Sequence, residues 1–406
     1  MSTTSTGDAT VHRNAPGLSA ASWMAAVAGL SGSLVAIGLA RFAYTPLIPS
    51  LIGAHWFAAS DVVTLGAANF AGYLAGALLG RPLAGALGSR WSLRLMMLAA
   101  TAAFFACAFP LSVAWFFVWR FLSGVSGGAI MVLVATSILP HIPPARRGMV
   151  SGIIFVGLGL GIAASGTLVP ALLRLGLVQT WAGLGLLSLA LTAISWSGWP
   201  PKDLPAPVAA PGEAEGGRTG GLLRVLYAEY ALNALGLVPA MVLLVDYVAR
   251  GLGRGADMGA LYWVLYGLSA IAGPLVCGPV ADRIGAGWAY RLSLALQAAA
   301  VALLAVSAHP AAIAVATIVL GMFTPGVVPL VLGRIRELLP HSHKLQQAAW
   351  SRATTAFALF QALAGYGYSY LFTHSGQNYG LIFLCGAGAL VVALIADTAA
   401  ALGGRK

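Results

Sequence analysis

The chain has 406 residues, of which 59% are hydrophobic and only 8% are charged, and its mean hydropathy is +0.87. Soluble domains carry about 25% charged residues, so this composition excludes a soluble globular protein and indicates an integral membrane protein. The formal net charge of +11 would suggest a nucleic-acid partner for a soluble chain. In a membrane protein, the position of each cation relative to the spans gives that charge its meaning.

The start of the chain, residues 1–17, is polar and lacks the cationic and short apolar segments of a secretory signal. Apolar runs of about 20 residues, the length that crosses a bilayer, then follow one another to the end. Backbone polar groups need internal partners in lipid, so spans of this kind are helices. The sequence therefore predicts an all-α fold with twelve transmembrane helices, at residues 21–48, 60–84, 92–110, 113–138, 149–173, 178–197, 222–249, 256–280, 289–307, 311–332, 347–372 and 378–401.

The first span contains a single cation, Arg41, within the apolar run from Leu34 to Ile52. An Arg at membrane depth costs between about 2.5 and 17 kcal/mol, and it is tolerated where it faces water or a partner inside the bundle. The alternative is that Arg41 extends its guanidinium into nearby lipid headgroups. Pro46 and Pro49 follow in the same run and would allow this helix to bend.

A segment rich in Pro, Gly and Ala, GWPPKDLPAPVAAPGEAEGGRTGG, separates the sixth span from the seventh and indicates a flexible linker. The predicted organisation is therefore an N-terminal tail (1–20), a six-helix amino-terminal bundle (21–197), the linker (198–221), a six-helix carboxy-terminal bundle (222–402) and a C-terminal tail (403–406).

The two halves resemble each other at an offset of 197 residues, which aligns the segment from Gly76 with the segment from Gly273. The shared Pro, Trp and Arg favour duplication over a chance match of two Gly-rich helices, and two repeats with a site between them are typical of transporters. The same offset pairs Gly124 with Gly321. Eight of the 23 aligned positions are identical: Gly76/Gly273, Leu78/Leu275, Pro82/Pro279, Ala84/Ala281, Gly88/Gly285, Trp91/Trp288, Arg94/Arg291 and Leu95/Leu292.

The cations are distributed unequally about the spans. With twelve spans, 17 of the 22 Lys and Arg side chains fall on the face that carries both termini, and Arg41 and Arg120 lie within spans. The opposite face has three, Arg174, Arg250 and Arg254. This asymmetry predicts a multi-pass protein of the bacterial inner membrane with both termini in the cytoplasm, and it accounts for the net charge without nucleic acid.

The sequence carries no pattern for a metal site, a cofactor or catalysis. Cys107, Cys277 and Cys385 lie in apolar runs, and the histidines fall in tails, loops and span ends. A polytopic membrane enzyme, the less favoured interpretation, needs a convergent catalytic set. We therefore expect no catalytic residues, no metal, no cofactor and no enzymatic activity.

Two motifs carry a resemblance to a known family. The segment Gly278-Pro-Val-Ala-Asp282-Arg283-Ile-Gly285 is similar to the G-x-x-x-D-R-x-G signature of the major facilitator superfamily, in the turn between the second and third helices of a half. Arg283 would clamp a carboxylate when the cytoplasmic side is shut; the alternative is an ordinary charged turn. In the first half Gly85 and Ala86 replace the Asp and Arg, which puts a clamp there in doubt. The predicted gating motif consists of Gly278, Asp282, Arg283 and Gly285 together with Arg90 and Arg352.

The second motif, Arg120-Phe-Leu-Ser-Gly124, is similar to the R-x-x-x-G pattern of the fourth helix. The segment GLARFAYTPLIP and the chain as a whole look like the YbfB/YjiJ-type branch of the superfamily. The resemblance implies two six-helix bundles, alternating access, and a central cavity lined by helices one, four, seven and ten. The fifth span has several glycines, which favour close helix packing, but lacks the Gly-Pro pair of the antiporter signature.

Helix directions place Arg41 and Arg120 in the external half at similar depth. If the resemblance brings both to one cavity, an anion between them would relieve their repulsion, because guanidinium groups suit carboxylate and phosphate. The alternative for Arg120 is a structural contact between helices or a gating role. The predicted translocation site comprises the two arginines and four polar partners, Tyr44, Asn69, Asn233 and Gln361.

Span seven offers two candidates for proton coupling, Glu229 and Asp246, because a carboxyl group can bind and release a proton. The alternative for Glu229 is an ion pair with Arg352, and Asp246 would mark an external gate. The predicted function is proton-coupled secondary transport of a small organic, anionic solute across the lipid bilayer. The alternative is proton-driven efflux of apolar or cationic compounds.

Overall fold

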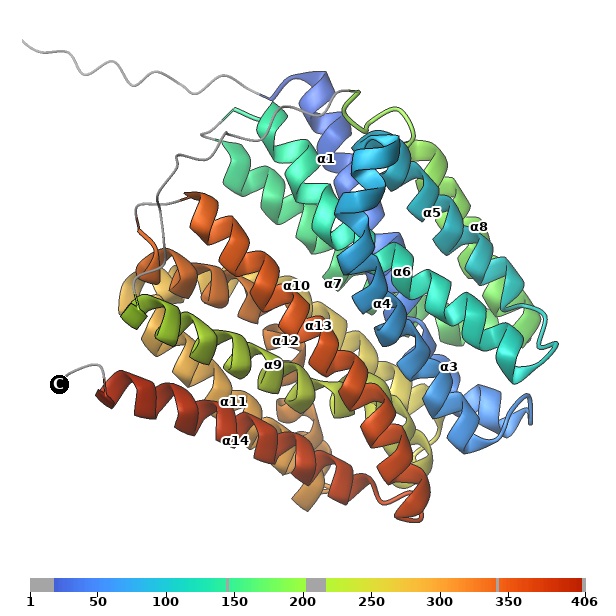
Figure 1. Ribbon diagram of the computed structural model, residues 1–406. Helices are drawn as coiled ribbons and strands as arrows, with labels where there is room; N and C mark the ends of the chain where they lie inside the picture. The colour runs from blue at the N-terminus through green and yellow to red at the C-terminus, as the bar shows by residue number, and fades with distance from the viewer. Residues whose placement is uncertain (1–17, 144–145, 202–216, 341–342, 404–406) are drawn as a thin grey trace, which may run out of the picture.

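The computed structural model describes residues 18–143, 146–201, 217–340 and 343–403, and these residues form helices with short connections (Figure 1). Most of the predicted tails (residues 1–17 and 404–406) and most of the predicted linker (202–216) lie outside them. The first pass is divided into α1 (Ala20–Ser33), the π-helical η1 (Leu34–Leu39), α2 (Ala40–Phe42) and α3 (Tyr44–Gly53). The others are α4 (Ala59–Leu87), α5 (Ser89–Ala106), α6 (Val113–Ile138) with η2 (Leu139–His141), α7 (Arg147–Leu173), α8 (Leu177–Ser195), α9 (Gly217–Asp246) with η4 (Tyr247–Gly251), α10 (Ala256–Ile284), α11 (Ala286–Val306), α12 (Pro310–Leu338), α13 (His343–His374) and α14 (Tyr379–Gly403).

Each of the twelve predicted spans coincides with a helical pass, which confirms the all-α prediction. Ten of the passes in the described chain are long and apolar enough to cross a membrane. The other two are α5, a short helix with Arg90 and Arg94 in its 18 residues, and the more polar α13. Within the linker prediction, α9 already begins at Gly217.

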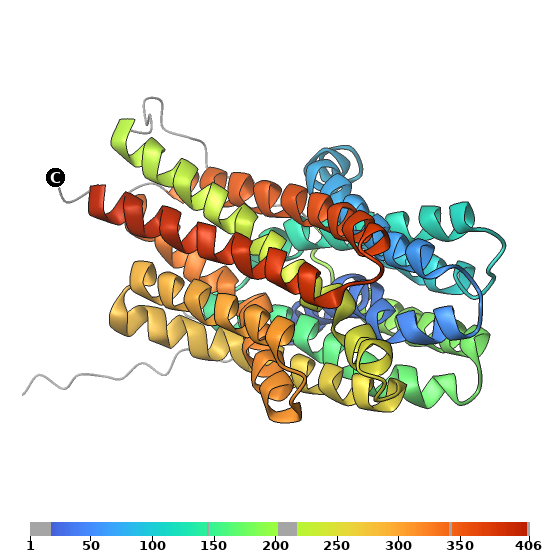
Figure 2. The ribbon, with the colours of Figure 1, turned by 90° about the horizontal axis from the view of Figure 1, so that it is seen from below.

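The helices form two groups that lie side by side, α1 to α8 in blue to green and α9 to α14 in yellow-green to red (Figure 1). In the second group α14 packs along α9, as the view from below shows (Figure 2). Many large apolar side chains, such as Leu78, Leu275 and Ile395, stay exposed on the outer surface. An apolar exterior of this kind is what a lipid environment requires.

Glycines at repeat-related positions make the same close contacts in the two groups. A Cβ on Gly76 would lie 2.0 Å from the carbonyl oxygen of Val125, and one on Gly273 would lie 2.0 Å from that of Met322. Val125 and Met322 are themselves 197 residues apart. Helices α4 and α6 therefore approach each other as closely as α10 and α12 do, through backbone contacts that only Gly allows.

The turn after the second helix of each group is also duplicated. Gly88 (φ 79°) and Gly285 (φ 84°) adopt the left-handed backbone conformation that favours Gly. Six residues after Gly88, Arg94 stacks on Trp91 and donates to the carbonyl oxygen of Trp196. Its counterpart Arg291 stacks on Trp288 and forms an ion pair with a carboxylate of α14. The predicted duplication is thus visible in matched local structure.

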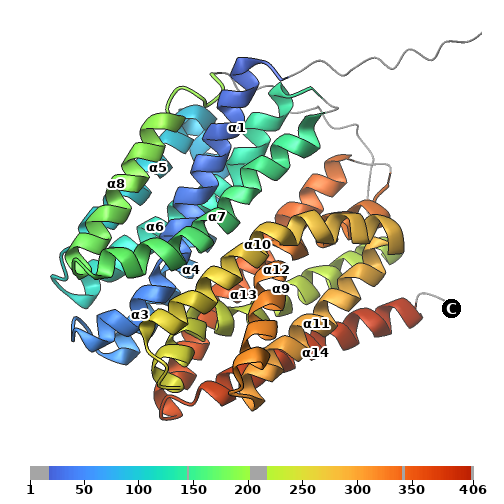
Figure 3. The same ribbon diagram turned by 180° about the vertical axis from the view of Figure 1, so that it is seen from behind.

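The two groups meet along two pairs of helices, α4 with α13 (Figure 1) and α7 with α10 (Figure 3). We call the side at which α1 begins and α14 ends the terminus side, and the opposite side the far side. Contacts between the groups concentrate toward the far side. There the Thr45 hydroxyl donates to the carbonyl oxygen of Met241 at 2.7 Å, and the hydroxyls of Thr64 and Ser369 lie 2.7 Å apart. The far side is therefore closed.

Candidate functional site

A cavity of about 200 Å³ lies between the two groups, from the middle of the helices toward the terminus side. Both groups contribute to its wall, which is largely apolar and includes six aromatic side chains. Arg41 is the one charged residue among the lining residues that the structure describes. The lining residues are Ile37, Arg41, Phe42, Tyr73, Met131, Ser151, Gly152, Phe155, Leu158, Tyr230, Leu237, Met241, Pro274, Thr324, Pro325, Val328, Pro329, Leu332, Trp350, Thr354, Phe357 and Gln361.

Arg41 is only 9% exposed and lies at the deep end of this cavity. Its Nε donates to Asn69 Oδ1 at 3.4 Å, and its guanidinium lies 4.1 Å from the centre of the Tyr73 ring. One terminal nitrogen, Nη2, is buried without a hydrogen-bond partner, and no described carboxylate forms an ion pair with Arg41. The alternative of snorkelling is wrong, because the group is enclosed by protein rather than directed to a headgroup region.

The local structure of the first pass explains why Arg41 points inward. The π-helical η1 immediately precedes it, and a π-helical turn rotates the residues that follow relative to a regular α-helix. Gly38 in η1 packs directly on Gly161 of α7, where an added Cβ would lie 2.7 Å from the Gly161 Cα. Pro46 then removes a backbone donor, and the helix is interrupted at Ala43.

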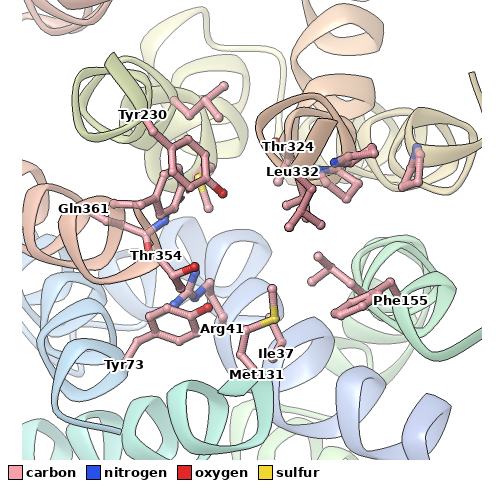
Figure 4. Close-up of a pocket in the computed structure, with 18 of the residues that line it drawn as sticks. Ile37, Arg41, Tyr73, Met131, Phe155, Tyr230, Thr324, Leu332, Thr354 and Gln361 are labelled. Carbon is pink, nitrogen blue, oxygen red and sulfur yellow. Dashed lines mark hydrogen bonds between the residues drawn. The ribbon is translucent and has the colours of Figure 1, made fainter. Parts of the chain in front are cut away.

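Two further polar side chains on α13, Thr354 and Gln361, line the cavity near Arg41 (Figure 4). The Thr354 Oγ1 and Gln361 Oε1 atoms are both buried without a hydrogen-bond partner. Gln361 Nε2 has only a weak contact with the Met241 sulfur at 3.9 Å. Three buried polar groups therefore face one another around the cavity with unused hydrogen-bonding capacity, which is uncommon in protein interiors.

Arg120 does not share this cavity, contrary to the expectation of one site for both arginines. It lines a separate space of about 10 Å³ within the first group. Its Nη1 donates to the carbonyl oxygen of Ala40 at 2.6 Å, and its guanidinium stacks 4.2 Å from the Tyr44 ring centre. The residue directs its charge at the helix that carries Arg41, so the geometry favours the structural alternative for Arg120.

Tyr44 and Asn69 support the arginines from behind the cavity wall. The Tyr44 hydroxyl donates to the carbonyl oxygen of Val62 at 2.7 Å. Asn69 accepts from Arg41 and donates to Ser123 Oγ at 2.9 Å and toward the Arg120 carbonyl oxygen at 3.5 Å. Asn69 thus links Arg41 to α6 through hydrogen bonds. Neither Tyr44 nor Asn69 lines the cavity itself.

Asn233 likewise lies outside the cavity. It is fully buried and donates to Gln297 Oε1 at 2.9 Å, which joins α9 to α11. This contact lies inside the second group. The structure therefore places Gln361 and Arg41 in the cavity and Asn69 behind it, while Asn233 belongs to a different helix contact.

Glu229 is 1% exposed, and its Oε1 has no hydrogen-bond partner. Its charged neighbours are Arg291, Arg334 and Asp397 of α11, α12 and α14. Arg291 Nε lies 2.5 Å from Asp397 Oδ2, and Arg334 Nη2 lies 3.9 Å from Asp397 Oδ1. The ion pairs between described residues do not include the expected alternative, Glu229 with Arg352, and Arg352 is exposed. The residue after Glu229, Tyr230, lines the cavity.

Both carboxylate oxygens of Asp246 accept hydrogen bonds from nearby side chains. Arg250 donates to Oδ1 at 2.5 Å and to Oδ2 at 2.6 Å, and the Tyr379 hydroxyl donates to Oδ2 at 2.6 Å. These three residues join the far end of α9 to the start of α14. Asp246 is fully buried and does not reach the cavity.

The charged turn between α10 and α11 is open in this structure. Asp282 and Arg283 are exposed and form no ion pair within the described chain. Gly278 has open space around it, and Gly285 provides the turn. Arg90, in the corresponding turn of the first group, is partly buried. A clamp by Arg283 stays a prediction for a conformation in which the terminus side is closed.

Tyr73 and Thr354 are cavity residues that the sequence analysis missed. A signal for both existed in helical spacing, because residues four or seven apart lie on one helix face. Tyr73 follows Asn69 by four residues, and Thr354 precedes Gln361 by seven. The other lining aromatic residues carried no such signal, since aromatic side chains occur throughout the spans.

Solved structures share the fold of this chain at low sequence identity. The crystal structure of a D-xylose-proton symporter matches with a TM-score of 0.71 at 14% identity, covering 92% of this chain and 96% of that one. The POT family transporter PepTSo matches with a TM-score of 0.72 at 12% identity, covering 96% and 99%. An auto-inhibited POT family peptide transporter matches with a TM-score of 0.67 at 16% identity, covering 95% and 97%.

A search of curated proteins found no match. The family described as "uncharacterised MFS-type transporter YbfB" matches residues 33–398. Because that family and the matched structures are transporters, the prediction of a transporter rather than an enzyme is confirmed. The chain is an integral multi-pass membrane protein that belongs to this YbfB-like family of major facilitator superfamily transporters.

Proposed function

We propose that the protein is a proton-coupled secondary transporter of a small organic anion that works by alternating access. The observation that carries this proposal is Arg41, a buried cation at the deep end of the cavity between the two groups that has no counter-ion among the described residues. A buried unpaired charge is unfavourable, and an anionic solute would supply the missing partner through a guanidinium fork. The unpartnered Thr354 hydroxyl beside it supports the same interpretation.

The conformation supports alternating access. The far side is closed by Thr45, Thr64 and their partners, while the cavity extends toward the terminus side. Movement of the unit 21–197 against the unit 222–402 would open the far side and close the terminus side. With the terminus side closed, Asp282 and Arg283 would form ion pairs that are absent among the described residues in this conformation. The excess of Lys and Arg favours the terminus side as the cytoplasmic side of an inner membrane.

Glu229 is the carboxyl group that best fits proton coupling. It is buried, one oxygen has no hydrogen-bond partner, and the adjacent Tyr230 lines the cavity. A proton on Glu229 would alter its interaction with Arg291 and Arg334, which compete for Asp397. Coupling through this group connects protonation to three helices of the second bundle. Asp246, bound on both oxygens, has no such freedom.

The test is uptake into proteoliposomes that hold the purified full-length protein, with a panel of labelled carboxylates and an imposed proton gradient. We expect accumulation of an anion that collapses when a protonophore is added. Arg41→Gln should abolish uptake, whereas Arg174→Gln, at an exposed position on the far side, should leave it intact. Flux of lipophilic cations alone would overturn the anion proposal in favour of efflux. Anion flux that ignores the proton gradient would overturn the coupling.

A further inference from the structure

We propose that the transported anion is a monocarboxylate with one compact apolar body, about the size of a single aromatic ring. This inference rests on the proposed function and specifies its substrate class. The observation behind it is that the cavity has two unlike poles (Figure 4). Arg41, Tyr73, Thr354 and Gln361 lie together on one side, and Phe155 and Leu332 lie across the cavity from them. Ile37 and Met131 lie beside Arg41 and continue the apolar wall toward Phe155.

The number of charges limits the substrate to one negative charge. Among the described lining residues, the guanidinium of Arg41 is the single formal charge. Arg120 lies outside this cavity, and its Nη1 donates to the Ala40 carbonyl oxygen within the first group. A dicarboxylate or a phosphate dianion would therefore carry an unpaired charge into an apolar space, which is strongly unfavourable. A monoanion leaves the site neutral.

The unused polar atoms match one carboxylate. Arg41 Nη2 and Thr354 Oγ1 are buried and unpartnered, and both can donate. The Gln361 amide presents its oxygen, but a half-turn would present its NH₂ group instead and would give up only the 3.9 Å contact with the Met241 sulfur. These three donors can pair with both oxygens of one carboxylate. The other polar side chains of the described wall outside this cluster are Ser151, Tyr230, Thr324 and Trp350, of which Thr324 is already paired with Tyr266 and the Leu320 carbonyl oxygen.

The apolar pole and the volume define the other end of the substrate. Ile37, Met131, Phe155 and Leu332 present no hydrogen-bonding groups, and Met is a side chain that adapts to the shape of its partner. A cavity of about 200 Å³ lies below the range of about 300–1,000 Å³ that holds drug-sized ligands. A benzoate-sized acid fits this space, and burial of its ring would make the largest favourable contribution to the free energy of binding.

The experiment measures binding of matched probes to the purified full-length protein by calorimetry and by thermal shift. The probes are benzoate, its uncharged isostere benzamide, the dianion phthalate, the polar monoanion lactate, and inorganic phosphate. We expect benzoate to bind at least tenfold more tightly than lactate, and we expect no measurable binding of benzamide, phthalate or phosphate. Compared with benzoate, benzamide lacks the negative charge, phthalate carries a second negative charge, and lactate and phosphate lack the apolar ring.

Two variants test the apolar pole directly. Met131→Gln places an amide in it at nearly constant volume and should weaken benzoate at least fivefold without weakening lactate. Met258→Gln, at an exposed position on α10, is the matched control and should change neither. If Met131→Gln fails to fold, Phe155→Leu serves the same purpose by shrinking the ring wall.

The outcomes separate the two proposals. Tightest binding by lactate, phthalate or phosphate would overturn the substrate class and leave anion transport standing. Binding of benzamide as tight as that of benzoate would overturn both, because the charge would then be irrelevant. Failure of every anion in the panel to bind would also overturn both.

Discussion

Two arginines at similar depth have opposite environments in this protein. Arg120 uses Nη1 on the Ala40 carbonyl oxygen and covers the Tyr44 ring, so its charge stabilises the contact between α6 and the first pass. Arg41 keeps Nη2 free and faces the cavity. Arg120 Nε is also without a hydrogen-bond partner, but Arg120 lines a space of only about 10 Å³. Arg41 is therefore the arginine with room for a ligand that its guanidinium can bind, and Arg120 is suited to packing.

The two carboxylates of α9 differ in the same way, and this gives a prediction. Asp246→Asn removes the partner of Arg250 and one acceptor of Tyr379, so we expect a loss on the order of 3 kcal/mol in stability. Glu229→Gln breaks no hydrogen bond or ion pair and should fold with the wild-type melting temperature, while it abolishes proton-driven uptake. Thermal unfolding in detergent and uptake measure the two effects.

Asp257→Asn, at an exposed position in the first turn of α10, is the control for the loss of a carboxylate. Equal melting temperatures for Asp246→Asn and Asp257→Asn would show that the Asp246, Arg250 and Tyr379 contacts contribute little. Retention of proton-driven uptake in Glu229→Gln would remove Glu229 from the coupling mechanism.

At the scale of helices, close packing depends on glycines that face carbonyl oxygens. A Cβ on Gly124 would lie 2.1 Å from the Asn69 carbonyl oxygen, and one on Gly321 would lie 2.3 Å from the Tyr266 carbonyl oxygen. Asn69 and Tyr266 are 197 residues apart, as Gly124 and Gly321 are. Backbone atoms cannot move aside as a flexible side chain can, so these positions admit no side chain without separation of the helices.

Substitution of either glycine should therefore give matched losses. We expect Gly124→Ala and Gly321→Ala each to destabilise the protein by about 1–3 kcal/mol, because overpacking forces backbone shifts. Gly85→Ala, where nothing lies within 4 Å of the added Cβ, should be neutral or stabilising by up to about 1 kcal/mol. The melting temperature of each of the three variants measures these effects. A wild-type melting temperature for Gly321→Ala would contradict equivalent packing in the two groups.

The helices were predictable from the sequence, but the direction of their polar side chains was predictable only in part. Length and hydropathy set each span, because lipid leaves the backbone no alternative to a helix. The π-helical segment at Leu34–Leu39 has no sequence signature comparable to a proline, and it alters the face on which Arg41 lies. Arg41 and Arg120 do lie at the same level of the first group, since Arg120 Nη1 donates to the Ala40 carbonyl oxygen, but they line separate spaces rather than the shared cavity that the sequence predicted.

For the whole molecule, the duplicated halves explain the position of the cavity. Matched packing inside each group makes two compact units, and the repeat predicted from paired Pro, Trp and Arg residues anticipates a site between them. The lining aromatic side chains and Thr354 come from several helices that are far apart in the chain. Their convergence depends on how the units dock, which no local pattern encodes. The conformation, closed on the far side, depends on docking as well.

That closure gives the last prediction. The hydroxyls of Thr64 on α4 and Ser369 on α13 lie 2.7 Å apart across the two groups, so cysteines at these positions are close enough to form a disulfide. In a background with Cys385→Ala, we expect oxidation of Thr64→Cys/Ser369→Cys to link the two halves and stop uptake, with recovery after reduction. Alternating access requires this result because the far side must open in each cycle. The single variants are the controls; full uptake by the linked protein would show that Thr64 and Ser369 stay together throughout transport.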